Sequence, residues 1–109
     1  MKLALWQTQG FPADTAANLA ALEQSARAAS AAGAALLLCP ECWLGGYNIG
    51  DAVASLAEAA DGESARRIAA IAREQRLAIA YGYAERAPAG AGGFFLGTRL
   101  NFKPFRPRW

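Results

Sequence analysis

Glu41 is the residue whose type and place in the chain point most directly to chemistry. The sequence contains no histidine, which excludes a Ser-His-Asp triad, a Cys-His pair and a zinc site with imidazole ligands. Glu41 follows an apolar run that ends at Pro40, and ligands in open α/β sheets collect at the carboxyl ends of strands. With Trp43 and Leu44 nearby, we expect a partly apolar pocket in which Glu41 acts as a general base. The alternative is a solvated loop glutamate.

Cys39 and Cys42 flank this glutamate in a C-x-x-C pattern. A redox pair of that kind opens a helix, whose N-terminus lowers a thiol pKa, but Gly45 and Gly46 follow shortly here. A zinc site needs about four ligands, and the chain has no further cysteine. We therefore expect a buried strand residue at Cys39, a loop residue at Cys42, and neither a metal nor a cofactor.

The glycine-rich stretch at residues 45–50 surrounds Tyr47. It lacks the G-x-G-x-x-G spacing of a dinucleotide site. The glycines are predicted to permit turns that fold Tyr47 over the end of the sheet, where it would contact a substrate.

An alternation of strands and helices is needed to place Glu41 at the edge of a sheet. Apolar runs predict strands, buried on both faces, at residues 2–8, 34–39 and 77–83. Helical patterns separate them at residues 15–32, 51–60 and 61–75. This order, with long connections, predicts parallel pairing and an α/β fold.

Local signals define the ends and faces of the two longer helices. Asp14 is a predicted N-cap and Gly33 a predicted C-cap of the first. Glu23 and Arg27 form an i,i+4 pair on its polar face. The predicted apolar faces comprise Leu19, Leu22, Ala26, Ala29 and Gly33 in the first helix, and Ala65, Ile68, Ile71 and Ala72 in the second.

The composition is that of one small globular domain. The 109 residues are 54% hydrophobic and 18% charged, which is not typical of a disordered chain. The sequence shows no signal-peptide pattern and no apolar run near the ~18 residues of a membrane helix. We therefore expect a cytoplasmic protein without a membrane partner.

Residues 87–109 differ sharply from the rest. They begin with a Gly-rich linker at 88–93 and carry four basic but no acidic side chains, at Arg99, Lys103, Arg106 and Arg108. Their interleaved aromatic residues suit single-stranded nucleic acid, although four charges are a weak signal and no RRM, KH or OB signature accompanies them. We expect an irregular tail that is disordered or translated out of frame.

Residues 36–47 resemble the first signature of the carbon–nitrogen hydrolase (nitrilase) superfamily: an apolar strand, Pro-Glu, a short apolar segment and Gly-Tyr. Flanking similarities lie at residues 2–7, 18–19, 33–34 and 77–85, so the resemblance covers residues 1–86. It implies the opening part of an αββα sandwich, in which residues 1–86 form the N-terminal part of the hydrolase domain.

The resemblance also implies a Glu-Lys-Cys triad that hydrolyses amides or nitriles through an acyl-thioester. Glu41 matches the base, whereas Lys103 precedes the family's lysine segment and Cys39 and Cys42 do not match its nucleophile. We therefore expect a truncated, inactive chain whose parent takes a small amide or nitrile, and whose uncovered sheet face leads to self-association or a homo-oligomer. The alternatives are a non-catalytic binding remnant and, third, a small nucleic-acid-binding protein that uses the basic tail.

Overall fold

A computed structural model describes residues 1–46, 48–87 and 94–101, the last segment by its backbone. Its elements are β1 (Leu3–Leu5), α1 (Thr15–Ala31), β2 (Leu36–Leu38), α2 (Ala52–Leu56), α3 (Glu63–Gln75), β3 (Ala78–Arg86) and β4 (Phe94–Asn101). The strands form one sheet in the order β1-β2-β3-β4, in which the first three are parallel and β4 is antiparallel to β3. This confirms the predicted α/β fold with parallel pairing of the first three strands.

α1 begins and ends where the sequence indicates. The Asp14 side chain accepts a hydrogen bond from the Ala17 amide at 3.0 Å, which satisfies one of the free N–H groups of the first turn. Gly33, with a φ of +85°, follows the C-cap residue Ala32 and adopts the left-handed conformation that glycine favours. Both predicted ends of the helix are therefore confirmed.

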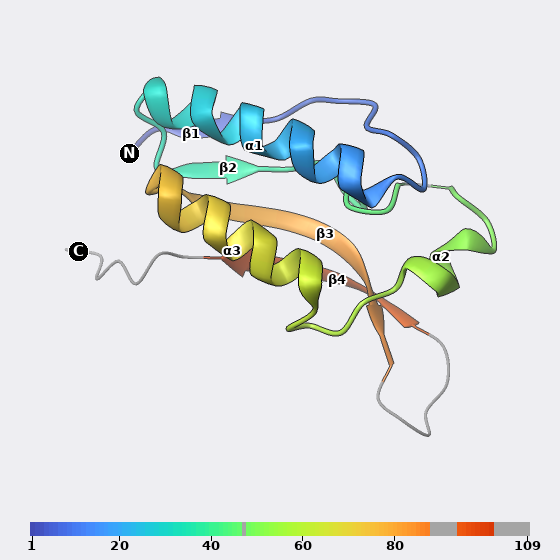
Figure 1. Ribbon diagram of the computed structural model, residues 1–109. Helices are drawn as coiled ribbons and strands as arrows, with labels where there is room; N and C mark the ends of the chain where they lie inside the picture. Colours follow the sequence, from blue (N-terminus) through green and yellow to red (C-terminus); the bar gives the residue numbers. More distant parts are fainter. Residues whose placement is uncertain (47, 88–93, 102–109) are drawn as a thin grey trace.

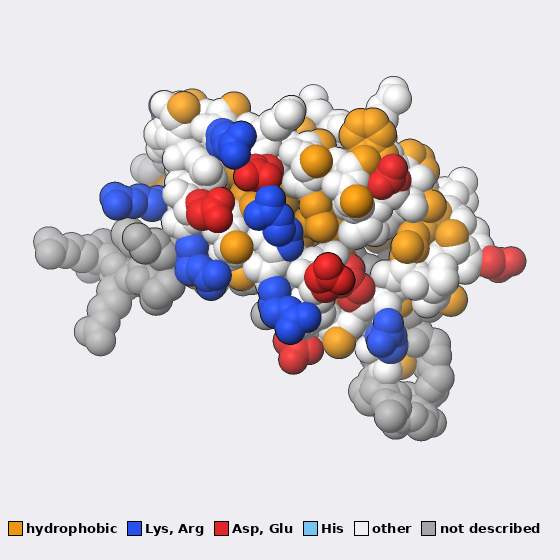
Figure 2. All heavy atoms as spheres, viewed as in Figure 1, with side chains coloured by type: hydrophobic (Ala, Val, Ile, Leu, Met, Phe, Trp, Pro, Cys, Tyr) orange, Lys and Arg blue, Asp and Glu red, His pale blue; other side chains and the backbone are white. Residues whose placement is uncertain are grey.

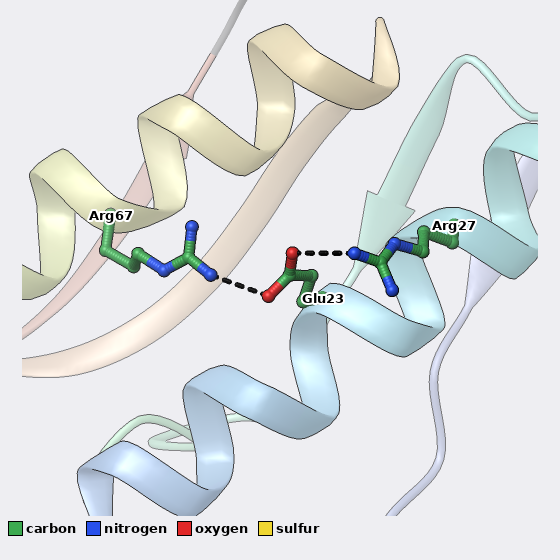
Figure 3. Close-up of polar contacts among 3 residues, drawn as sticks. All are labelled: Glu23, Arg27 and Arg67. Atoms are coloured by element: carbon green, nitrogen blue, oxygen red, sulfur yellow. Dashed lines mark hydrogen bonds and ion pairs between the residues drawn. The ribbon is translucent and has the colours of Figure 1, made fainter.

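α1 and α3 lie side by side on one face of the sheet (Figure 1). On the outer surface, Glu23 of α1 accepts from Arg27 at 2.9 Å and from Arg67 of α3 at 2.6 Å, so one carboxylate joins both helices (Figure 3). Figure 2 shows side chains of both charges interspersed over these helices.

The core lies between these helices and the sheet. It is formed by alternate strand residues, such as Leu37, Ile79 and Tyr81, and by the apolar faces of both helices. Every predicted apolar residue of α3 is buried, and the predicted face of α1 contributes Leu22, Ala26 and Ala29.

The opposite side of the sheet, here called the open face, presents Leu3, Leu5, Leu36 and Leu38. Leu3 and Leu5 are 51% and 73% exposed, and Leu36 and Leu38 are half-buried. The prediction that the strands are buried on both faces therefore needs correction for β1. α1 and α3 pack on the same face, and the remaining described helix, α2, lies beside the end of β3 and does not cover β1 (Figure 1).

The predicted irregular tail also needs correction, at residues 94–101. These residues form β4, which pairs with β3 from Arg86↔Phe94 to Ile79↔Asn101. The predictions for residues 88–93 and 102–109 lie outside the described residues.

Candidate functional site

The edge of β3 that faces β2 is paired with three separate segments of the chain. β2 pairs with its beginning. The amides that donate to β3 carbonyls beyond the end of β2 are Cys39 to Ala80 (2.9 Å), Leu44 to Gly82 (3.3 Å) and Glu58 to Ala84 (3.0 Å). Two loops therefore leave this edge and return to it, residues 40–43 and residues 45–57. The first loop carries Glu41.

Loop 40–43 crosses close over β3 at Gly82. A Cβ atom on Gly82 would lie 2.6 Å from the Cys42 amide nitrogen, a distance that real Cβ atoms essentially never show. Because side chains alternate along a strand, this missing Cβ belongs to the same side as Ala80, which pairs with Leu38 on the open face. Glu41 thus lies on the open-face side at the carboxyl ends of the parallel strands, where it was predicted.

Trp43 anchors the same loop on the helix side of the sheet. Its ring lies 5.4 Å from that of Trp6 and 6.4 Å from that of Tyr81, and both Trp43 and Leu44 are buried. Glu41 itself is exposed. The predicted apolar pocket around Glu41 is therefore not found among the described residues, because the neighbours expected to form it turn into the core.

A cavity of about 220 Å³ lies beside this loop. Most of its lining is apolar; the lining residues are Cys42, Leu44, Gly45, Gly46, Asn48, Ile49, Gly50, Val53, Leu56 and Ala84. Tyr47, the predicted substrate-binding residue, lies outside the described residues, between two that line the cavity. Cys42, the residue after Glu41 in the chain, is one of the lining residues.

The two cysteines are free thiols in different surroundings: Cys39 lies against the core and Cys42 lines the cavity. Cys39 packs against the core, and burial raises the pKa of its thiol to about 12. Burial, followed by the negative charge of Glu41, also raises the pKa of the Cys42 thiol. Both thiols are therefore held in the protonated form at neutral pH, which is unfavourable for a nucleophile.

The described residues contain no group of three or more His, Cys, Asp or Glu side chains that could hold a metal ion. Nor does any helix within residues 1–46 and 48–87 combine the length and apolar character needed to cross a membrane.

Two residues that bear on the loop were missed by the sequence analysis as site residues. Asn18 is fully buried in α1, and its side-chain amide donates to the Leu44 carbonyl at 3.0 Å. A polar residue on the apolar face of Leu22 and Ala26 is a signal that could have revealed it. Gly82 stands alone inside an apolar strand pattern, which indicates a close backbone approach.

A sequence profile described as "Carbon-nitrogen hydrolase" matches residues 2–104. The chain is also 53% identical over 91 residues to a Pseudomonas protegens protein described as "Hydrolase in pqqF 5'region". That alignment covers 83% of this chain and 31% of the relative.

Solved structures of an amidase from Nesterenkonia sp. are similar in fold. The amidase superposes with a TM-score of 0.74 at 29% identity, covering 90% of this chain and 36% of its own. A cysteine-to-alanine variant of the Nesterenkonia AN1 amidase, described as from the nitrilase superfamily, gives 0.75 at 30% identity, with 92% and 37% coverage. The same type of variant in complex with butyramide gives 0.74 at 29% identity, with 90% and 37% coverage. This chain therefore spans about a third of the length of its relatives.

Proposed function

Since this chain belongs to the carbon–nitrogen hydrolase family, we propose that it supplies Glu41 as the general base of an amidase with a Glu-Lys-Cys triad. One observation carries the proposal. Within a family match over residues 2–104, Glu41 follows the end of β2 after Cys39 and Pro40 and is exposed on the open-face side; Cys42, the next residue in the chain, lines an apolar cavity. Carboxyl ends of parallel strands are where α/β proteins bind their ligands.

In this proposal, the Glu41 carboxylate takes the proton of a cysteine thiol, whose ordinary pKa of ~8.5 keeps it mostly protonated at neutral pH. The thiolate attacks the amide carbon, and the proton leaves with the amine as the acyl-thioester forms. Water, deprotonated by the same carboxylate, then releases the acid and restores the thiol. A lysine stabilises the charge that develops on the carbonyl oxygen.

Neither described cysteine suits the role of nucleophile. Cys39 packs against the core, and the pKa of each thiol is raised rather than lowered. The one lysine in the described part of the chain, Lys2, donates to the Ala32 carbonyl at the far end of the strands. The proposal therefore assigns the nucleophile and the lysine to residues outside this chain, in the portion of the relatives that it does not span.

Short aliphatic amides are the proposed substrates. Leu44, Ile49, Val53 and Leu56 give the cavity beside Cys42 an apolar wall, and its volume of about 220 Å³ suits a small acyl group rather than a long one. The Nesterenkonia amidase is described in complex with acrylamide in a variant that changes a glutamate and a cysteine, and in complex with butyramide in a variant that changes the cysteine. Nitriles are the alternative class.

The test uses two proteins: residues 1–109, and a chimaera in which this chain replaces the matching segment of the Pseudomonas protegens hydrolase. We expect the chain alone to release no ammonia from acetamide or butyramide, and the chimaera to hydrolyse both. Glu41→Gln in the chimaera keeps the side-chain shape but removes the base, so kcat should fall by about 10⁴-fold or more.

Glu74→Gln is the matched control, because Glu74 is an exposed glutamate of α3 on the helix-covered side. It should leave kcat unchanged. An active Glu41→Gln chimaera would refute the proposal, as would an acyl-thioester on Cys39 or Cys42 detected by mass spectrometry.

A second function, docking of a partner on the open face without catalysis, is favoured by the exposure of Leu3 and Leu5. The same chimaera distinguishes this function from the amidase. If the open face serves only for docking, the chimaera should bury this face and remain inactive toward every amide.

A further inference from the structure

We propose that Asn18 and Gly82 are positioning residues for Glu41, which they hold in place through Leu44 and Cys42. The inference rests on the proposed function of Glu41 as the base. Among the described residues, no side chain donates a hydrogen bond to the Glu41 carboxylate. The contacts that these two residues make are to the backbone of Glu41 and of the residues after it: Gly82 lies against Cys42, and Asn18 binds the Leu44 carbonyl.

Asn18 of α1 binds the backbone at Leu44, where loop 40–43 ends. Its side-chain amide donates to the carbonyls of Leu44 and Phe11, both at 3.0 Å, and its oxygen accepts from the Phe11 amide at 2.8 Å. All three contacts are to backbone, and the side chain is fully buried. A buried amide satisfied in this way holds its partners firmly, because leaving any of them unpaired would be unfavourable.

Gly82 fixes the same loop from β3. Its carbonyl accepts from the Leu44 amide at 3.3 Å, so Leu44 is bound through its N–H to β3 and through its carbonyl to α1. The missing side chain also leaves room for Cys42, whose amide nitrogen would lie 2.6 Å from a Cβ atom. The next nearest atoms to this Cβ would be Cys42 Cα at 3.4 Å and Glu41 C at 3.5 Å. These are also backbone atoms, so no side-chain rotation could relieve the clash.

The consequence for chemistry is a defined backbone position for the residue that carries the base. Cys42 has a φ of +50°, a left-handed conformation that a non-glycine residue adopts only when its surroundings enforce it. Proton transfer to a carboxylate requires hydrogen-bond distance, and a displacement of about 1 Å can reduce the rate about 100-fold. Any shift of the backbone beneath Glu41 should therefore reduce turnover more than substrate binding.

The first experiment measures amide hydrogen exchange in residues 1–109, comparing the Leu44 amide with that of Cys39, which donates to Ala80. Gly82→Ala should lower protection of Leu44 relative to Cys39 by about tenfold or more. Gly45→Ala is the matched control, since a Cβ there has its nearest contact at 3.8 Å, an ordinary distance. It should leave the ratio unchanged.

Asn18→Asp provides a second, independent variant in case Gly82→Ala does not fold. It keeps the side-chain shape but faces two carbonyls with an acceptor, so it should also lower the ratio for Leu44. Leu22→Ala, in the same helix, is its control for lost stability, because it should lower protection of both amides equally. Unchanged ratios in both Gly82→Ala and Asn18→Asp would overturn the inference.

The second experiment separates this inference from the proposed function. In the chimaera, Gly82→Ala should reduce kcat about 100-fold with KM within about threefold, and Asn18→Asp should reduce kcat about tenfold. If Glu41→Gln is inactive while Gly82→Ala retains full kcat, the positioning role fails and the base survives. If Glu41→Gln is active, the proposed function itself fails, and the exchange ratios alone decide whether the loop is held as described.

Discussion

The two faces of the sheet carry similar apolar residues but differ in how far those residues are buried. On the helix-covered face, Leu37 is 2% exposed and packs among the side chains of α1 and α3. On the open face, Leu5 of β1 is 73% exposed, although it pairs with Leu38 in the same sheet. The identity of a strand leucine therefore does not determine its burial; the element packed against it does.

The two faces also differ in their relation to the loop that carries Glu41: one holds the residues that anchor the loop, and the other leaves Glu41 exposed. The helix-covered face holds the anchors of the loop that carries Glu41, namely Trp43 and Asn18. Glu41 is exposed on the open-face side, and Cys42, the next residue in the chain, lines the cavity. A rigid packed layer beneath an accessible loop is the arrangement in which binding residues are commonly found.

The largest expected difference is in thiol reactivity, between Cys39, which packs against the core, and Cys42, which lines the cavity. Burial raises the pKa of Cys39 from 9.0 to about 12, so at pH 8 its thiolate should be about a thousandfold rarer than that of an ordinary cysteine. Alkylation by iodoacetamide, followed by peptide mass mapping, should modify Cys42 first. The rate at Cys39 should keep rising up to about pH 12, whereas an ordinary thiol levels off above 9. Equal rates at both cysteines would remove the contrast.

Stability should respond to truncation on one face only. Ile71 is fully buried between α3 and the sheet, and Ile71→Ala should lower the free energy of unfolding by about 2–5 kcal/mol. Leu5→Ala should change it by less than about 0.5 kcal/mol, because the side chain is already largely in solvent. Urea denaturation of both variants measures the difference, and a large effect at Leu5 would show that the open face is covered.

Self-association should depend on the open face. Leu3 and Leu5 expose apolar area on one strand, which favours association of residues 1–109 in solution. Leu5→Lys should shift the light-scattering mass of a concentrated sample toward the monomer. Phe11→Lys is the control, since Phe11 is a large exposed apolar residue of the loop before α1. A compact monomer for the unaltered chain would contradict the prediction.

The smallest effect is expected on the outer surface of the helices. Glu23 pairs with Arg27 and Arg67, whose side chains are 62% and 43% exposed. Glu23→Gln should therefore lower the free energy of unfolding by about 1 kcal/mol or less, and less still at high salt. Arg27→Ala and Arg67→Ala, measured by urea denaturation in low and high salt, divide that effect between the pair within α1 and the pair that joins the helices.

Local sequence signals were enough for the two longer helices, whereas the helix predicted at residues 51–60 was too long: α2 ends at Leu56, and Glu58 bridges to β3 instead. The Asp14 cap, Gly33 and the spacing of Ile68, Ile71 and Ala72 each depend on residues within a few positions, and all were predicted. The place of Glu41 after the second strand was predicted for the same reason, because Pro40 ends an apolar run in the sequence itself.

Features that depend on distant residues were not predicted. β4 has no alternating pattern and follows a Gly-rich stretch, so its pairing with β3 could not be recognised from the segment alone. The exposure of Glu41 depends on Trp43 finding Trp6 and Tyr81 in the core, 37 and 38 residues away along the chain. Glu58, whose amide and carbonyl bind Ala84 and Arg86 of β3, gave no strand signal at all.

The edge of β3 that pairs with three separate segments has a consequence for which parts of the sequence can vary. Residues 45–57 leave β3 at Leu44 and rejoin it at Glu58, and both attachment points are backbone hydrogen bonds that do not depend on side-chain identity. Insertions or replacements between them leave the strand register untouched, and doubling the length of a flexible loop costs only about 0.6 kcal/mol. Since this segment lines most of the cavity, new sequences grafted between the two attachment points should change the shape and lining of the cavity without redesigning the scaffold.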